Sequence, residues 1–203
     1  MEATDDAFRE RYPLREGLAL YQCISLFVGG SERKNIRNIP LPPVFPRSRN
    51  DFFRLLESDA RVIHVSCHGN SDGLTLRKRT KFEYDEFLDV DFSSRARLLF
   101  VNACEVAKGP ATLAALASLC QGSRKERYVI APSNEVSFET ALIFAIHFYR
   151  LLLARRMSIV KAFKRATVLL GDFADLEYVC LDALRMKEYS ASRGQTTERR
   201  LRC

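Results

Sequence analysis

Apolar and amphipathic segments alternate along the chain, and this alternation predicts its secondary structure. Runs that are almost wholly apolar predict buried strands at residues 19–30, 61–69, 96–107 and 126–135. Segments with apolar residues at helical spacing predict helices at residues 50–60, 84–90, 109–123, 137–156 and 158–172. A short β excursion is expected from residue 74, residues 175–189 fit a last strand or a last helix, and the Pro-rich residues 38–50 cannot be helical.

This order of elements indicates the fold class. Near-continuous apolar strands separated by helices are typical of a parallel sheet that is covered on both faces. We therefore expect an α/β fold with a mostly parallel central sheet flanked by helices. Ser137 and Ser158 precede two of the helices and are expected to cap them.

Length and charge suggest one domain with a basic tail. The 203 residues predict a single domain over residues 1–186. Residues 187–203 hold five basic and two acidic residues with almost no apolar content, so we expect this tail to be disordered. The net charge of +7 is otherwise spread along the chain, which favours a solvated surface over direct nucleic-acid binding. A nucleic-acid binder would show binding that weakens steeply with salt.

The remaining composition limits the cellular context. No apolar run approaches the ~20 residues of a membrane span, and the acidic, polar residues 1–13 do not form a secretory signal, so no membrane contact is expected. The six cysteines include no C-x-x-C pair and mostly lie in apolar runs. They predict free thiols in a reducing, cytoplasmic compartment. No metal or cofactor is expected.

A histidine and a cysteine end two of the predicted strands. His68 ends residues 61–69, and Cys104 lies near the end of residues 96–107. Alternation places His64 and His68 on one face of their strand, with Cys67 on the other. If the two strands are neighbours, an imidazole and a thiol emerge together at the carboxyl edge of the sheet, where ligands of such sheets bind. This pair is the minimal catalyst for acyl transfer through a thiol.

The same predicted strand also carries His64 and Cys67, for which a structural role is expected. His64 lies deeper in the strand and is expected to be a structural histidine, and Cys67 is expected to pack in the core. A zinc site of His64, Cys67 and His68 is excluded because side chains of one strand cannot converge on one ion.

Three sequence stretches carry a resemblance to a known family. They are "HVSCHG", "VNACE" and "VIAPSNEVSFETALIFAIHFYRLLLARRMSIVKAFKRA". Their order and context resemble the CHAT family of caspase-like cysteine peptidases, which is grouped with caspases, metacaspases, separase and gingipains. The resemblance spans roughly residues 60–166, with the histidine 36 residues before the cysteine. It implies a caspase-like α/β/α sandwich.

The resemblance also implies roles for individual residues. His68 matches the catalytic histidine and Cys104 the nucleophile, while the backbone N–H groups of Gly69 and Cys104 would line the oxyanion hole. Relatives that cleave after basic residues have an acidic pocket, for which the candidate residues here are Asp72, Glu105 and Glu135.

Two classes of function follow. The first is a cysteine endopeptidase that acts on a protein substrate and is controlled by an activating event or by a regulatory or scaffold protein. The second is a catalytically idle caspase-like module that only binds a partner. Intact His68 and Cys104 favour the peptidase, because an abandoned site usually loses one of them.

Overall fold

The computed structural model describes residues 11–29, 42–75, 80–119, 125–171, 176–185, 187–192 and 195–200. In chain order the elements are α1 (Arg11–Gly29), α2 (Arg49–Leu56), β1 (Val62–Ser66), β2 (His68–Gly69), β3 (Gly73–Thr75), β4 (Lys81–Glu83), the 3-10 helix η2 (Tyr84–Asp89), β5 (Leu98–Asn102), α3 (Pro110–Ser118), β6 (Tyr128–Pro132), α4 (Phe138–Tyr149), the π-helical turn η3 (Arg150–Ala154), α5 (Ile159–Leu169), β7 (Glu177–Asp182), β8 (Lys187–Ser192) and β9 (Gln195–Arg200).

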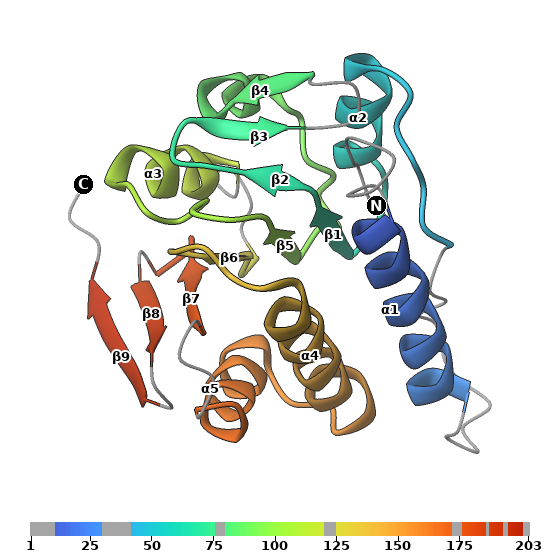
Figure 1. Ribbon diagram of the computed structural model, residues 1–203. Helices are drawn as coiled ribbons and strands as arrows, with labels where there is room; N and C mark the ends of the chain where they lie inside the picture. The colour runs from blue at the N-terminus through green and yellow to red at the C-terminus, as the bar shows by residue number, and fades with distance from the viewer. Residues whose placement is uncertain are drawn as a thin grey trace.

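The central sheet is mixed. Its six strands lie in the order β1-β5-β6-β7-β8-β9. β1, β5 and β6 are parallel, whereas β7, β8 and β9 each run antiparallel to the strand before them. A second, three-stranded antiparallel sheet, β2-β3-β4, follows directly from β1 (Figure 1). The parallel arrangement expected from the sequence therefore holds for the three strands that surround the candidate site.

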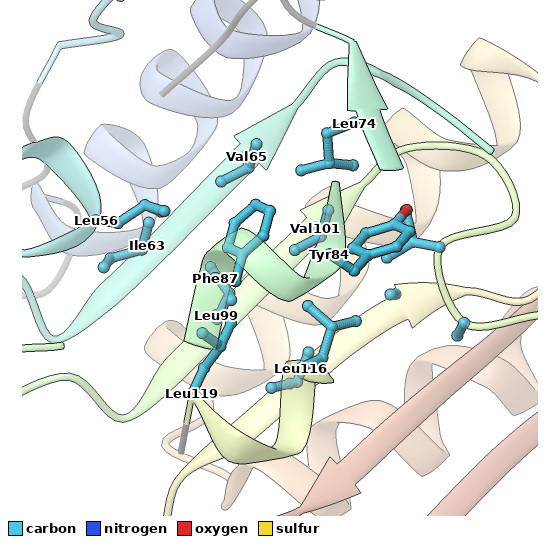
Figure 2. Close-up of a cluster of buried hydrophobic side chains, with 14 of the residues drawn as sticks. Leu56, Ile63, Val65, Leu74, Tyr84, Phe87, Leu99, Val101, Leu116 and Leu119 are labelled. Carbon is cyan, nitrogen blue, oxygen red and sulfur yellow. The ribbon is translucent and has the colours of Figure 1, made fainter. Parts of the chain in front are cut away.

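Helices cover both faces of the central sheet (Figure 1). Alternation along β5 explains the two cores, because Leu99 and Val101 face one side and Leu98 and Phe100 the other. The first core packs against α2, α3, η2 and the small sheet, as Figure 2 shows for Leu99, Val101 and their neighbours. The second core is built largely from aromatic side chains of α4 and α5. The result is an α/β fold with helices on either side of a mixed sheet.

The expected caps are confirmed. The hydroxyl of Ser137 accepts a hydrogen bond from the backbone N–H of Thr140 at the start of α4. Ser158 accepts in the same way from Lys161 at the start of α5. Each cap satisfies a backbone donor that has no partner within its helix. The β excursion is seen as β3 and β4, with residues 76–79 outside the described part of the chain.

The prediction of a strand at residues 19–30 is wrong, because these residues up to Gly29 belong to helix α1. Glu16, Leu20 and Ile24 are spaced four residues apart, and α1 turns this side towards the sheet, where Leu20 and Ile24 join the second core. A short apolar run does not by itself separate a strand from a buried helix. The signal for a helix is the four-residue spacing of these positions, which begins at Glu16, before the apolar run starts. It was missed because its first position is a charged residue.

The expectation of a disordered C-terminal segment is also wrong for residues 187–192 and 195–200, which form β8 and β9. Backbone pairing with β7 and cross-strand charge pairs replace the apolar content that these strands lack. Buried Glu188 accepts from Arg199 at 2.8 Å, and Lys187 donates to Glu198 at 2.6 Å. Within the predicted last element, residues 177–182 and 187–189 therefore form strands rather than a helix.

Two further properties of the described chain bear on function. Cys23, Cys67, Cys104 and Cys180 are free thiols, as expected. Among the described helices, none combines the length and the apolar character needed to cross a bilayer.

Candidate active site

The pairing of β1 with β5 brings the segments that carry His68 and Cys104 side by side. Every residue of β1 pairs with the β5 residue 36 positions later, from Val62 with Leu98 to Ser66 with Asn102. A hydrogen bond from the Cys67 N–H to the Asn102 carbonyl, 3.3 Å long, continues the pairing beyond the strand. The same offset of 36 separates residues 68 and 104 in the sequence. The register of the sheet therefore brings the segments that carry the two residues to the same edge of the sheet.

Cys104 lies at a sharp turn between a buried strand and a loop. β5 is buried throughout, and Cys104, two residues beyond it, is half-buried. The next residue, Glu105, has a left-handed backbone with φ of 57°, which is uncommon for a residue other than glycine. The N–H of Glu105 donates to the Asn134 carbonyl at 3.0 Å, which holds this turn. Strained turns of this kind persist only where the surrounding structure holds them in place. They are found more often at functional sites than elsewhere.

Gly69 lies directly against the backbone of the nucleophile candidate. A Cβ atom added at Gly69 would lie 2.9 Å from the Cβ of Ala103 and 2.9 Å from the carbonyl oxygen of Cys104. Both distances are shorter than a normal contact, so only glycine fits here without a shift. This close approach shows that the two chain segments remain adjacent beyond the strands.

Two backbone N–H groups beside this turn, those of Gly69 and Cys104, have no hydrogen-bond partner among the described residues. The Asn70 N–H donates to the Gly73 carbonyl and closes the β2–β3 hairpin. Because hydrogen-bonded and non-hydrogen-bonded pairs alternate in antiparallel strands, Gly69 and Leu74 form a non-hydrogen-bonded pair, and the Gly69 N–H points away from β3. Within the described part of the chain, the Cys104 N–H also has no hydrogen-bond partner.

The side chains of the candidate dyad are accessible but not hydrogen-bonded to each other. His68 is exposed on β2. The Sγ atom of Cys104 lies 3.8 Å from the carbonyl oxygen of Val136, to which it donates a weak hydrogen bond. Across the residues that the structure describes, no hydrogen bond joins His68 to Cys104. Catalytic hydrogen bonds are often long or misaligned before substrate binds, so this geometry is compatible with a dyad.

The three acidic residues expected to form a substrate pocket come from three separate loops. Glu105 forms an ion pair with Lys108 at the turn after Cys104. Glu135 is exposed in the loop between β6 and α4. Asp72 is exposed in the β2–β3 turn, where its carboxylate accepts a hydrogen bond from Ser71. Glu105 and, more weakly, Glu135 both raise the pKa of Lys108, so these two carboxylates lie near one cation.

Asp72 does line a groove of its own. This groove has a volume of about 540 Å³ and lies between the small sheet, η2 and α3. Its lining includes the carboxylates of Asp72, Glu83 and Asp85 together with Leu88 and small residues of α3. The Thr112 hydroxyl at the start of α3 donates to the Ser71 carbonyl at 3.2 Å, which links the helix to the turn that follows His68.

His64 is a structural histidine, as expected from its depth in the strand. Its Nε2 atom lies 3.2 Å from Glu16 Oε1, its Nδ1 atom lies 3.0 Å from the Tyr149 hydroxyl, and its ring stacks on Phe100. Burial lowers the pKa of His64, although the Glu16 carboxylate opposes this shift. We assign the proton of the neutral ring to Nε2, because an ionised carboxylate can only accept and Tyr149 can donate to Nδ1. With both nitrogens engaged in the interior, His64 has none left for a substrate.

Glu16 is a buried carboxylate that the sequence analysis missed. It is 3% exposed and accepts hydrogen bonds from Ser66 Oγ at 2.6 Å and from Asn102 Nδ2 at 2.5 Å. Burial alone would raise the pKa of Glu16, but interactions with His64, Ser66 and Asn102 outweigh burial and lower it. The Tyr178 hydroxyl donates to Asn102 Oδ1 at 2.6 Å, which fixes the orientation of that amide. No local sequence signal pairs Glu16 with partners about 50 and 86 residues away.

The neighbouring thiol Cys67 is chemically inert by comparison. It is buried among the apolar residues of the first core, as expected. Burial, followed by the negative charge of Glu16, raises the pKa of the Cys67 thiol far above its ordinary value. Of the two thiols at this edge, Cys104 is therefore the one that can react. Within the described part of the chain, no group of three His, Cys, Asp or Glu residues could hold a metal ion.

Comparisons with known proteins do not identify a family for this chain. No protein-family model matches the sequence, and no curated protein is significantly similar to it.

Proposed function

We propose that this protein is a caspase-like cysteine endopeptidase of the CHAT type, in which Cys104 is the nucleophile and His68 the general base. The observation that supports the proposal is the register of β1 and β5, which brings the segments that carry His68 and Cys104 to the same edge of the sheet. The left-handed turn at Glu105 and the close approach of Gly69 support the same assignment.

The chemistry follows from these positions. His68 takes the thiol proton of Cys104, and the sulfur attacks the carbonyl carbon of the scissile peptide bond. The N–H groups of Gly69 and Cys104 donate to the oxyanion that develops in the tetrahedral intermediate. His68 then gives its proton to the departing amine, and a water molecule, deprotonated by His68, hydrolyses the thioester and regenerates the thiol.

The test is the reactivity of Cys104 towards a broad set of peptidyl acyloxymethyl ketones, read by mass spectrometry, together with hydrolysis of a randomised peptide library. We expect wild-type protein to be labelled at Cys104, and His68→Ala to lower the labelling rate by a factor of about 100 or more. Cys104→Ala should hydrolyse no peptide. Cys23→Ala and His147→Ala are matched controls, because they remove a half-buried thiol and a half-buried imidazole outside the site.

The opposite result would identify the alternative function. If Cys104 is labelled at the same rate with and without His68, the two residues do not act as a dyad. The fold would then be an idle module whose role is to bind a partner protein.

A further inference from the structure

A single carboxylate from α1 connects the two strands that lead to the candidate dyad. Ser66 and Asn102 are paired residues on β1 and β5. Glu16 binds both, with Oε2 accepting from Ser66 and Oε1 accepting from Asn102. The carboxylate therefore bridges the last paired position of the two strands.

This bridge lies next to the dyad. Ser66 precedes His68 by two residues, and Asn102 precedes Cys104 by two. Beyond the bridge the main strands end, because β2 turns away to pair with β3 and the chain after Cys104 enters the Glu105 turn. The Glu16 contacts thus join the two strands at their last paired position, two residues before each reactive group.

The remaining described contacts of α1 have a different character. Leu20 and Ile24 pack against the second core, and Leu18 and Leu26 are exposed. Apolar packing is non-directional, whereas hydrogen bonds to an ionised carboxylate are directional and about twice as strong as those between neutral groups. Glu16 therefore supplies the directional contacts between α1 and the sheet, and the same contacts join the ends of β1 and β5.

We propose that Glu16 is a positioning residue for the candidate active site, and that docking of α1 through Glu16 keeps His68 and Cys104 competent to react. This inference rests on the proposed function and adds a means of its regulation: an event that lifts α1 from the sheet would disable the site without touching the dyad. Besides Ser66 and Asn102, Glu16 binds the structural His64, so it acts through neighbouring side chains and contacts no substrate.

The experiment compares Glu16→Ala with Leu20→Ala, which weakens docking of the same helix through apolar contacts alone. The readouts are the alkylation rate of Cys104 by iodoacetamide and hydrogen–deuterium exchange of residues 64–69 and 100–105, both measured well below each variant's unfolding temperature. We expect Glu16→Ala to slow alkylation by about tenfold or more and to speed exchange in both segments. Leu20→Ala should lower thermal stability with a much smaller effect on either readout.

Glu16→Gln provides a rescue and a safeguard against misfolding. Its amide can accept from Asn102 and donate to Ser66, so it should restore most of the alkylation rate and of the exchange protection. Equal effects of Glu16→Ala and Leu20→Ala, or wild-type exchange in Glu16→Ala, would overturn the positioning role.

Failure of the proposed function has a separate signature. It would appear as an alkylation rate that does not depend on His68 in the wild-type background. The exchange data would still decide whether Glu16 holds the two strand ends.

Discussion

Substitution of Gly69 by alanine tests the close approach on which the candidate site depends. The added Cβ would lie 2.9 Å from both Ala103 Cβ and the Cys104 carbonyl oxygen, and 3.3 Å from Val106 Cγ2. A normal contact between carbon atoms is about 3.5 Å or longer. The segment that carries His68 must therefore move away from the Cys104 turn by about 0.6 Å. The backbone of Gly69 is outside the left-handed region, so the effect comes from this contact and not from the conformational preference of alanine.

Two magnitudes follow from that displacement. Overpacking against buried Ala103 and Val106 is expected to lower the free energy of unfolding by about 1–3 kcal/mol. Because a misplacement of about 1 Å can cost a factor of about 100 in rate, we expect labelling of Cys104 to slow by about 10- to 100-fold. Urea denaturation gives the first quantity, and the rate of labelling by an acyloxymethyl ketone gives the second.

Gly109→Ala is the matched control. A Cβ at Gly109, the N-cap of α3, would meet only the Thr112 hydroxyl at 3.8 Å, which is an ordinary contact. Alanine is a poorer N-cap than glycine, so this variant loses up to about 1 kcal/mol without moving the strand ends. If Gly69→Ala keeps the wild-type labelling rate, or if both variants lose rate in proportion to their loss of stability, the reasoning from the close approach is refuted.

Three further outcomes can be measured independently. Ser137→Ala, which removes the cap of α4, should lower the free energy of unfolding by about 1 kcal/mol in urea denaturation, and an unchanged midpoint would contradict the cap. Burial, opposed by Glu16, lowers the pKa of His64 in the folded protein. On acidification the unfolded chain therefore binds a proton at this histidine near pH 6.5, whereas the folded protein binds it only at lower pH. The free energy of unfolding should therefore fall from pH 7 to pH 5, with a smaller slope in His64→Gln; equal slopes would exclude His64 as the source. If the groove at Asp72 receives a basic substrate side chain, Asp72→Asn should raise KM several-fold for peptides with lysine or arginine at the cleavage site but not for matched glutamine peptides, and Glu135→Gln, outside that groove, should change neither.

The sequence by itself determined the elements whose signals are local. The buried strands around residues 61–69, 96–107 and 126–135 follow from uninterrupted apolar runs, and the starts of α4 and α5 follow from their serine caps. The same local information predicted His68 and Cys104 at the ends of two strands, whereas β1 ends at Ser66, His68 begins β2 of the small sheet, and Cys104 follows β5 by two residues. Alternation along a strand is a property of the backbone, and it needs no knowledge of the rest of the fold.

Only the tertiary structure decided how those elements meet. The apolar run at residues 19–30 fits a strand or a helix, and α1 forms because Leu20 and Ile24 can join the second core while Glu16 reaches Ser66 and Asn102. The polar segments β8 and β9 form strands because β7 offers an edge to pair with, which no property of their own sequence reveals. The buried carboxylate beneath the candidate dyad was missed for the same reason. A charged residue can be buried only where its partners converge, and here those partners come from strands that are distant in sequence and adjacent only in the folded chain.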